Sequence, residues 1–155
     1  MPSTVEWMVR KGMQRYWRWQ RAMTLGARGI VIDGDGRLLL VRQTYSKGWI
    51  FPGGGVEFDE TIETSLAREL DEEAGIALTG PPQLLGIYSN RATFPGDHVA
   101  VYVVRSWRQA RIMTPNREIA ELGFFDRDGL PHDTTEGTRR RIEELDGRVP
   151  RRDVW

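Results

Sequence analysis

The sequence has 155 residues, a length typical of one domain built around a single hydrophobic core. Its 22 basic residues balance its 22 acidic residues, so the chain lacks the excess positive charge of proteins that bind nucleic acids through phosphates. It contains no cysteine, which excludes disulfide bonds, thiolate metal ligands and a cysteine nucleophile. No apolar run reaches the roughly 18 residues of a membrane span, and no signal-peptide pattern opens the chain. We therefore expect a cytoplasmic protein that binds neither DNA nor a membrane.

Residues 4–22 predict a basic, aromatic helix, which forms an N-terminal extension over residues 1–24. Its bulky apolar residues are Trp7, Met8, Met13, Tyr16, Trp17 and Trp19, and its basic residues are Arg10, Lys11, Arg15, Arg18 and Arg21. Such a segment can lie on an anionic membrane or bind a partner. Tryptophan is normally core or interface material, so we favour a helix that packs on the domain or across a homodimer.

Two strands joined by a tight turn are predicted next. The segments Ala27 to Ile32 and Arg37 to Arg42 contain runs of β-forming residues, and the Asp-Gly-Asp-Gly sequence at 33–36 between them is a strong turn signal. We expect these segments to pair as a β-hairpin. Residues 45–55 then predict a loop, in which the glycines at 53–55 let the backbone approach another group closely.

A central helix is predicted from apolar residues that recur at helical spacing. The expected buried stripe consists of Leu66, Ala67, Leu70 and Ala74. Asp59 is the expected N-terminal cap of this helix, and Gly75 is the expected end.

Further strands and a second helix complete the predicted domain, which spans residues 25–147. The strands are expected over 83–89, 99–107 and 121–126, the helix over 134–145, and a frayed tail over 148–155. Strands on both sides of a helix in the sequence favour a mixed β-sheet covered by helices, which is an α/β or α+β sandwich.

Three glutamates of the central helix carry the candidate chemistry. Glu69, Glu72 and Glu73 stand at positions i, i+3 and i+4, so their carboxylates project from one face of the helix. Like charges at this spacing repel one another, and a divalent cation relieves the repulsion. Oxygen ligands favour hard cations over zinc, so we expect Mg²⁺, with Mn²⁺ as a substitute.

The glycines and the acidic helix together form a specific motif. An acidic helix face alone is usually just exposed to solvent, and a glycine run alone is usually a turn. The joint spacing here is Gly54, five residues, Glu60, seven residues, and then Arg68-Glu69-Leu70-Asp71-Glu72-Glu73-Ala74-Gly75-Ile76. This pattern resembles the Nudix box without a mismatch. The chain is identified as a member of the Nudix hydrolase family, which implies a Nudix-type α/β/α sandwich.

The resemblance implies roles for individual residues. The implied metal ligands are Glu69, Glu72, Glu73, the auxiliary acid Glu57 and the carbonyl of Gly53. Arg68 matches the arginine that orients the box glutamates by ion pairing, and Glu60 matches a supporting acid. Catalytic roles fall to Glu72, Glu73 and Arg68.

The general base has two candidates. Glu73 comes first. Glu118 comes second, because relatives place a catalytic acid just ahead of the strand expected over 121–126. An ordinary surface glutamate is an equally good interpretation of Glu118.

Family membership implies hydrolysis of a nucleoside diphosphate linked to another group, and the box says little about that group. Candidate substrate-binding residues are Arg28, Arg42, Tyr45 and Trp49, followed by Arg91, His98, Tyr88 and Phe94. Residues of these types contact phosphates and sugars or stack on bases. We favour ADP-ribose or a nucleotide sugar as the small-molecule substrate.

Other functions stay open at this point. One is a sanitising hydrolase of oxidised nucleoside triphosphates, and another is an RNA-end pyrophosphohydrolase, which only the basic N-terminal segment supports. A third is a non-catalytic Nudix-fold module that senses a nucleotide. The complete set of box glutamates argues against the third function, because degenerate modules usually lose at least one of them.

Overall fold

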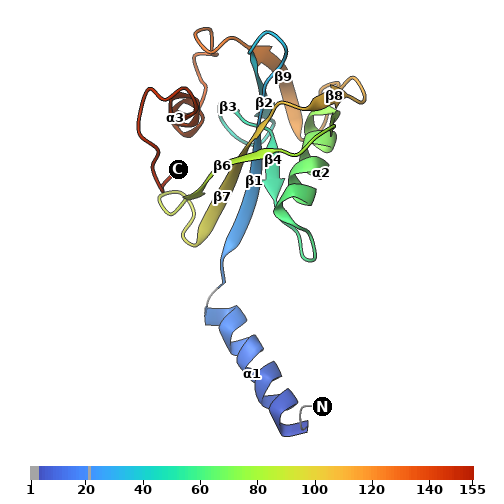
Figure 1. The fold of residues 1–155 in the computed structure, drawn as a ribbon, viewed down its shortest axis with the longest axis vertical. Coiled ribbons are helices and arrows are strands. Elements are labelled where there is room, and N and C mark those ends of the chain that lie inside the picture. The colour runs from blue at the N-terminus through green and yellow to red at the C-terminus, as the bar shows by residue number, and fades with distance from the viewer. Residues whose placement is uncertain (1–3, 21) are drawn as a thin grey trace.

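The computed structural model of the protein describes residues 4–20 and 22–155, which form three helices and nine strands (Figure 1). The helices are α1 (Thr4–Gln20), α2 (Ile62–Ala74) and α3 (Glu136–Leu145). The strands are β1 (Thr24–Val31), β2 (Leu38–Gln43), β3 (Trp49–Ile50), β4 (Gly53–Gly55), β5 (Ile76–Leu78), β6 (Gln83–Ser89), β7 (Asp97–Val104), β8 (Trp107–Gln109) and β9 (Ile119–Phe125). The predicted N-terminal helix is confirmed, while Arg21 and the side chains of Arg18 and Trp19 lie outside the described residues.

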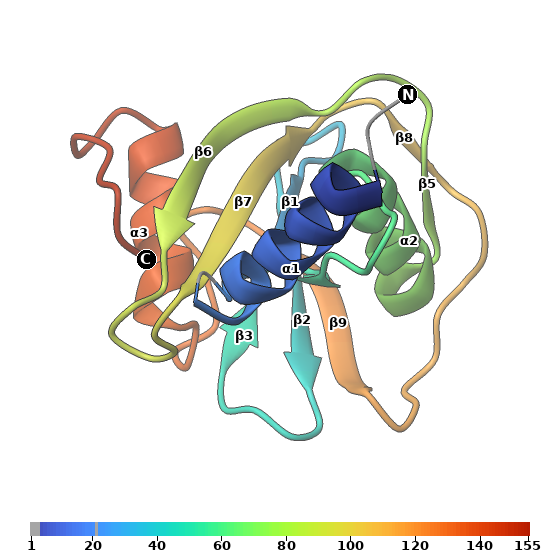
Figure 2. The ribbon, with the colours of Figure 1, turned by 90° about the horizontal axis from the view of Figure 1, so that it is seen from below.

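A mixed four-stranded sheet forms the centre of the domain. Its strand order is β4-β1-β7-β6, with β1 parallel to β7 and antiparallel to β4. A second sheet has the order β3-β2-β9, and β5 pairs with β8 near α2 (Figure 2). The α+β fold with a mixed sheet, expected from the sequence, is confirmed.

Helices flank the central sheet on both faces (Figures 1 and 2). Side chains of a strand alternate between the two faces of its sheet, and β1 shows this clearly. Val31 packs with Leu66 and Leu70 of α2, whereas Ile30 packs with Ile142 of α3 in a separate core cluster. The middle strand is therefore held from both sides by buried apolar contacts, and it provides a rigid base for the groups that lie on it.

The predicted hairpin between the first two strands is wrong. The turn itself forms, and the Asp33 carboxylate accepts hydrogen bonds from the backbone N–H groups of Asp35 and Arg37 at 3.0 and 2.9 Å. The flanking strands join different sheets, and Ile32 and Leu38 form an isolated bridge between them. Because β4 and β7 already pair with both edges of β1, β2 pairs with β3 and β9 instead.

The start of α2 also differs from the prediction, whereas its end agrees. Thr61 caps the helix, and its side-chain oxygen accepts a hydrogen bond from the backbone N–H of Thr64 at 3.1 Å. The expected cap, Asp59, lies before it with a left-handed φ of 67°. Gly75 ends the helix as predicted, with a φ of 65° that suits glycine.

The segment predicted as a loop over 45–55 contains two short strands. β3 pairs with β2, and β4 pairs with β1 so that Gly54 lies opposite Ala27. Three glycines are poor strand formers in isolation, which is why the sequence favoured a loop. The neighbouring strand β1 provides the pairing that the local sequence does not predict.

Segment 148–155 is fixed on the domain, so the prediction of a frayed tail is wrong. The backbone N–H of Trp155 donates to the carbonyl of Ser89 at 3.0 Å, and the N–H of Ser89 donates to the carbonyl of Asp153 at 2.7 Å. The Trp155 ring meets the Tyr88 ring edge-on, with 6.2 Å between centroids. A large aromatic side chain thus holds the segment against β6.

Helix α1 extends away from the domain (Figure 1). Its described side chains, at positions 7–17, are all exposed. The option that this helix packs on its own domain is therefore wrong for those side chains. None of the helices among the described residues has the length and apolar character needed to cross a membrane.

Candidate active site

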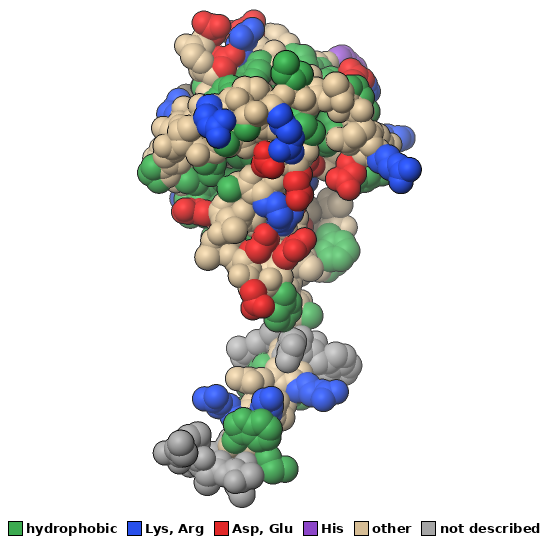
Figure 3. Space-filling view, turned by 90° about the vertical axis from the view of Figure 1, so that its right-hand side faces the viewer, with side chains coloured by type: hydrophobic (Ala, Val, Ile, Leu, Met, Phe, Trp, Pro, Cys, Tyr) green, Lys and Arg blue, Asp and Glu red, His purple; other side chains and the backbone are tan. Residues whose placement is uncertain are grey.

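Acidic side chains gather on the face of the molecule that carries α2 (Figure 3). Arg68 lies among them. Its Nε and Nη2 donate to the two oxygens of Glu60 at 2.8 and 3.0 Å. Its Nη1 donates to Glu69 Oε1 at 2.8 Å and to Glu72 Oε2 at 3.3 Å, and Glu57 approaches to 4.0 Å. One guanidinium therefore bridges several carboxylates that repel one another.

This cluster shifts the pKa values of two of its members. The side-chain hydrogen bonds from Arg68, followed by the backbone N–H of Glu57, lower the pKa of Glu60 to about 2. The hydrogen bonds to Glu60 raise the pKa of Arg68 above its already high usual value. Both groups therefore stay charged at neutral pH, so the ion pair persists under physiological conditions.

Glu73 points inward from α2 and lies apart from the Arg68 cluster. It is 5% exposed. One carboxylate oxygen accepts a hydrogen bond from the backbone N–H of Gly53 at 2.8 Å, and the other accepts one from Gln43 Nε2 at 3.2 Å. Burial raises the pKa of Glu73, and these two hydrogen bonds oppose the rise. A carboxylate with a raised pKa accepts a proton more readily, which suits a general base.

Two glycines of β4 set how closely the sheet approaches these acids. Gly53 has a φ of 144°, and a Cβ there would lie 2.0 Å from the carbonyl oxygen of Ala27. A Cβ at Gly54 would lie 2.4 Å from Glu69 Oε1, whereas one at Gly55 would meet nothing within 4 Å. The close backbone approach predicted for the glycine run is therefore confirmed at its first two positions.

The donor set on this face fits a hard divalent cation. Glu69, Glu72 and Glu73 offer carboxylate oxygens, the ligands that Mg²⁺ and Mn²⁺ prefer. Within residues 4–20 and 22–155, no three His, Cys, Asp or Glu side chains are gathered closely enough to hold a metal ion as they stand. Arg68 holds Glu69 and Glu72, and Gly53 holds Glu73. Binding a cation therefore requires these carboxylates to turn toward a common point.

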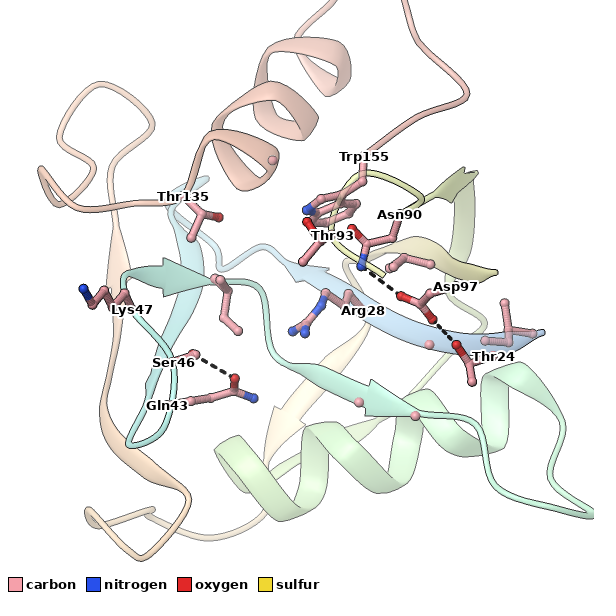
Figure 4. Close-up of a pocket in the computed structure, with 17 residues that line it drawn as sticks. Thr24, Arg28, Gln43, Ser46, Lys47, Asn90, Thr93, Asp97, Thr135 and Trp155 are labelled. Atoms are coloured by element: carbon pink, nitrogen blue, oxygen red, sulfur yellow. Dashed lines mark hydrogen bonds between the residues drawn. The ribbon is translucent and has the colours of Figure 1, made fainter. Parts of the chain in front are cut away.

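A pocket of about 570 Å³ opens beside the acidic face (Figure 4). Arg28 on β1 points into it, and its Nη1 donates to the carbonyl of Phe51 at 2.7 Å. Burial lowers the pKa of Arg28, and the nearby charge of Glu73 opposes this shift. Gln43, which donates to Glu73, also lines the pocket. A guanidinium in this place is suited to contact a phosphate.

The other substrate-binding candidates that ranked with Arg28 do not line the pocket. Arg42 forms ion pairs with two acidic side chains at 3.1 and 2.5 Å. Trp49 is a core residue, 7% exposed, whose ring packs edge-on against Phe125. Tyr45 is 71% exposed. Arg28 is the member of the group that lines the pocket, and Tyr45 interacts electrostatically with both Arg28 and Glu73.

The second group of substrate candidates is also dispersed. Tyr88 is buried in the core, and its hydroxyl donates to Glu144 at 3.0 Å. Arg91 and Phe94 are exposed in the loop after β6, and His98 is partly buried on β7. These positions do not converge on the acidic face.

Glu118, the second candidate for the general base, lies in the loop before β9 with its side chain exposed. Its backbone N–H donates to Asn116 Oδ1 at 2.8 Å, and its carbonyl accepts a hydrogen bond from the N–H of Thr44 at 2.8 Å. The next residue, Ile119, pairs with Gln43 of β2. The backbone of this loop is therefore anchored beside the partner of Glu73.

Several pocket residues carried no recognisable signal in the sequence. Asp97 accepts hydrogen bonds from Thr24 Oγ1 at 2.6 Å and from Asn90 Nδ2 at 2.9 Å, and Trp155 lines the pocket beside them. These residues are far apart in the chain. Pairing of β1 with β7 and docking of segment 148–155 on β6 bring them together, and neither contact could be inferred from local sequence.

The residues of this acidic face belong to the motif that resembles the Nudix box. The family model of the NUDIX domain matches residues 23–145 of the chain. The chain belongs to the Nudix hydrolase family. The resemblance found in the sequence is thereby confirmed. In this Nudix fold, Gly54 of the motif lies on β4, Glu60 lies just before α2, and Arg68 and the three glutamates at 69, 72 and 73 lie on α2, so that strand and helix form the two sides of one acidic site.

Known Nudix proteins resemble this chain over most of its length. A crystal structure of a MutT NUDIX hydrolase from Burkholderia pseudomallei has a TM-score of 0.67 and 30% identity, over 79% of this chain and 97% of that one. A protein of Methanocaldococcus jannaschii named ADP-ribose pyrophosphatase is 33% identical over 104 residues, which are 65% of this chain and 61% of that protein. A protein of Halorhodospira halophila named RNA pyrophosphohydrolase is 34% identical over 94 residues, which are 61% of this chain and 41% of that protein. The matches to the M. jannaschii and H. halophila proteins thus span less than two thirds of the length of each of those proteins.

The contact between Gly54 and Glu69 can be tested directly. Gly54→Ala places a methyl group against the Glu69 carboxylate, and we expect it to lower hydrolytic activity about 10- to 100-fold, as when a group that supports a metal ligand is disturbed. Gly55→Ala adds the same methyl group in open space and should keep near wild-type activity. Steady-state rates, with melting temperatures as the folding control, check both variants. Equal activity in the two would show that Glu69 is not held against β4 during the reaction.

Proposed function

We propose that this Nudix protein is a metal-dependent hydrolase that cleaves the phosphoanhydride bond of a nucleoside diphosphate linked to another group. One observation carries the proposal. Gln43 donates a hydrogen bond to Glu73, which is buried on α2, and Gln43 also lines the pocket into which Arg28 points. The acidic face and the pocket therefore belong to one site, with a proton acceptor and a phosphate-binding cation on adjoining walls.

The proposed metal ligands are the oxygens of Glu69, Glu72 and Glu73, together with Glu57 and the carbonyl of Gly53. Bound there, Mg²⁺ or Mn²⁺ would lower the pKa of water and neutralise charge on the phosphates. Arg68 acts as a positioning residue, because Glu60 anchors its guanidinium while its Nη1 donates to Glu69 at 2.8 Å. Without this bridge, the box carboxylates would spread apart.

Glu73 is the proposed general base. Its raised pKa favours proton acceptance, and the hydrogen bonds from Gly53 and Gln43 fix the orientation of its carboxylate. Glu118 is the second candidate, because its loop adjoins Gln43 through the pairing of Ile119. Arg28 is proposed to contact the phosphates of the substrate.

A small nucleotide derivative fits this site better than a polymer does. The pocket of about 570 Å³ lies within the range of roughly 300–1,000 Å³ that is typical of small-molecule sites. The chain has no net charge, which disfavours a long polyanion such as RNA. ADP-ribose or a nucleotide sugar is therefore the proposed substrate class, ahead of an oxidised nucleoside triphosphate. The similarity to the ADP-ribose pyrophosphatase of M. jannaschii is compatible with this class.

Removing single carboxylate charges tests the proposed chemistry. A panel of ADP-ribose, nucleotide sugars and oxidised nucleoside triphosphates first identifies the substrate. Its hydrolysis should need added Mg²⁺ or Mn²⁺, and Glu72→Gln and Glu73→Gln should each lower turnover by at least about a hundredfold, because a ligand or the base is lost. Glu63→Gln changes the first turn of the same helix and is the matched control. Full turnover in EDTA, or in both box variants, would contradict the proposal.

We also propose that α1 joins two copies of the chain in a homodimer. Val9, Met13 and Tyr16 lie along one helical stripe and are 56%, 51% and 53% exposed. Residues 1–24 contain five basic residues and one acidic residue, so the rest of this neutral chain has a net charge of −4. An exposed apolar stripe and opposite net charges favour contact of α1 with a second copy.

A single added charge on the stripe tests this contact. Met13→Glu is expected to shift the dimer toward monomer, because the carboxylate would be buried in the interface. Gln14→Glu adds the same charge about 100° around the helix and should leave the dimer intact. Sedimentation equilibrium at several concentrations measures both, together with a chain that lacks residues 1–20, which should lose dimerisation or substrate affinity but still require metal. A monomeric wild type, or a truncated chain that still dimerises with unchanged substrate affinity, would overturn the role of α1.

A further inference from the structure

The pocket has an aromatic wall that the proposed chemistry does not use. Trp155 lines it together with Asn90 and Thr93, which belong to the loop after β6 (Figure 4). Gln43, the partner of Glu73, lines the part of the pocket that adjoins α2. The pocket therefore has an acidic, phosphate-binding side and a side with an indole ring and polar side chains.

A buried charged residue holds the Trp155 ring. Arg141 on α3 is fully buried, and its guanidinium carbon lies 4.1 Å from the ring centroid of Tyr88 and 5.3 Å from that of Trp155. Its Nη2 donates to Glu144 at 2.9 Å, and its Nη1 donates to the carbonyl of Val154 at 3.3 Å. Removing one member of a buried ion pair leaves the charge of the other member buried and uncompensated. Segment 151–155 is thus fixed by contacts that are costly to lose.

Helix α3 also leaves room for the indole. A Cβ at Gly137 would lie 2.2 Å from Trp155 Nε1, so only glycine allows the ring to sit where it does. The backbone N–H of Trp155 donates to the carbonyl of Ser89 at 3.0 Å. The backbone of Trp155 is therefore fixed by Ser89, and the edge of its indole ring lies against Gly137. The residue is partly exposed and lines the pocket.

Polar groups beside the indole are held in defined orientations. Asp97 accepts hydrogen bonds from Thr24 Oγ1 at 2.6 Å and from Asn90 Nδ2 at 2.9 Å (Figure 4). The second bond fixes the amide of Asn90, so that its Oδ1 faces away from Asp97 and is placed to accept a hydrogen bond. A flat aromatic surface with a fixed polar edge matches the face and edge of a nucleobase.

We infer that Trp155 is a specificity-determining residue on which the nucleobase of the substrate stacks, with Asn90 at the edge of the base. This inference rests on the proposed function for the phosphate end of the site, where Arg28 and the box glutamates act. The fixed position of the ring matters, because a rigid stacking surface loses little conformational entropy when the base binds. The chain would then select nucleotides over sugar phosphates that lack a base.

The test compares ligands that differ in the base alone and cannot be hydrolysed at a phosphoanhydride. AMP, GMP, CMP and UMP carry a base, and ribose 5-phosphate lacks one. Affinity is measured by calorimetry, and quenching of tryptophan fluorescence is followed in parallel. The variants are Trp155→Leu, which keeps an apolar side chain but cannot stack, and Trp155→Phe, which can stack. Trp107→Leu is the control, because Trp107 stacks on Phe124 and does not line this pocket.

We expect the wild type and Trp107→Leu to bind at least one nucleoside monophosphate at least about tenfold more tightly than ribose 5-phosphate, which corresponds to about 1.4 kcal/mol. Trp155→Leu should lose this difference, and Trp155→Phe should keep part of it. Quenching by the nucleotide should disappear in Trp155→Phe. On the hydrolysed substrate, Trp155→Leu should raise KM with little change in kcat.

Two outcomes overturn the inference: equal binding of monophosphates and ribose 5-phosphate by the wild type, or an unchanged preference in a folded Trp155→Leu protein. If Trp155→Leu does not fold, loss of nucleotide quenching in Trp155→Phe decides the question alone. Failure of the proposed function looks different. In that case no diphosphate compound is hydrolysed, while the dependence of nucleotide binding on Trp155 is still observed.

Discussion

Arg68 binds both oxygens of Glu60 and also reaches Glu69 and Glu72, and the geometry of the acidic face follows from these bonds. Three glutamates within about one helical turn repel one another, so α2 needs positive charge on this face even before any cation binds. The guanidinium supplies one such charge and is anchored by Glu60, whose lowered pKa keeps it ionised at neutral pH. Under the proposed metal binding, Glu69 and Glu72 would exchange part of their contact with Arg68 for a metal ion and would turn toward it.

The sheet holds the other side of the site at a fixed distance from α2. β1 lies between two apolar clusters, so its position is set by core packing. β4 pairs with β1, and the missing side chains at Gly53 and Gly54 let that strand approach Ala27 and Glu69. The N–H of Gly53 then donates to Glu73. Core packing, strand pairing and carboxylate orientation are therefore linked in one chain of contacts.

The sequence was most informative where function depends on short spacing. Helix α2 and its end at Gly75 are local features, and each follows from residues within a few positions of one another. The close approach of the glycines was predicted from their lack of side chains, but the groups that they approach, Ala27 and Glu69, are distant in the chain. The Asp33 turn is also local, but the strands around it pair elsewhere, because pairing depends on which edges are already occupied by distant strands. The local sequence pattern thus predicted helices and strands better than it predicted which strands pair with one another.

The same limit of local sequence patterns applies to single residues in and near the pocket. Trp49 was a substrate-binding candidate because an aromatic side chain can stack on a base, yet it fills the core against Phe125. Trp155 looked like part of a frayed tail, yet contacts with Arg141 and Ser89 bring it to the pocket. Both differences arise from contacts between residues that are distant in the chain. Such contacts leave no periodic signal in a single sequence.

The central claim is that the carboxylates of α2 bind a divalent cation, and electron paramagnetic resonance of Mn²⁺ titrated into the protein tests it most directly. The account predicts that the wild type binds Mn²⁺ and that Glu69→Gln weakens this binding at least about tenfold, as expected when a ligand is removed, while the melting temperature in EDTA is maintained. Mn²⁺ binding that is absent in the wild type, or unchanged in Glu69→Gln, would contradict the account.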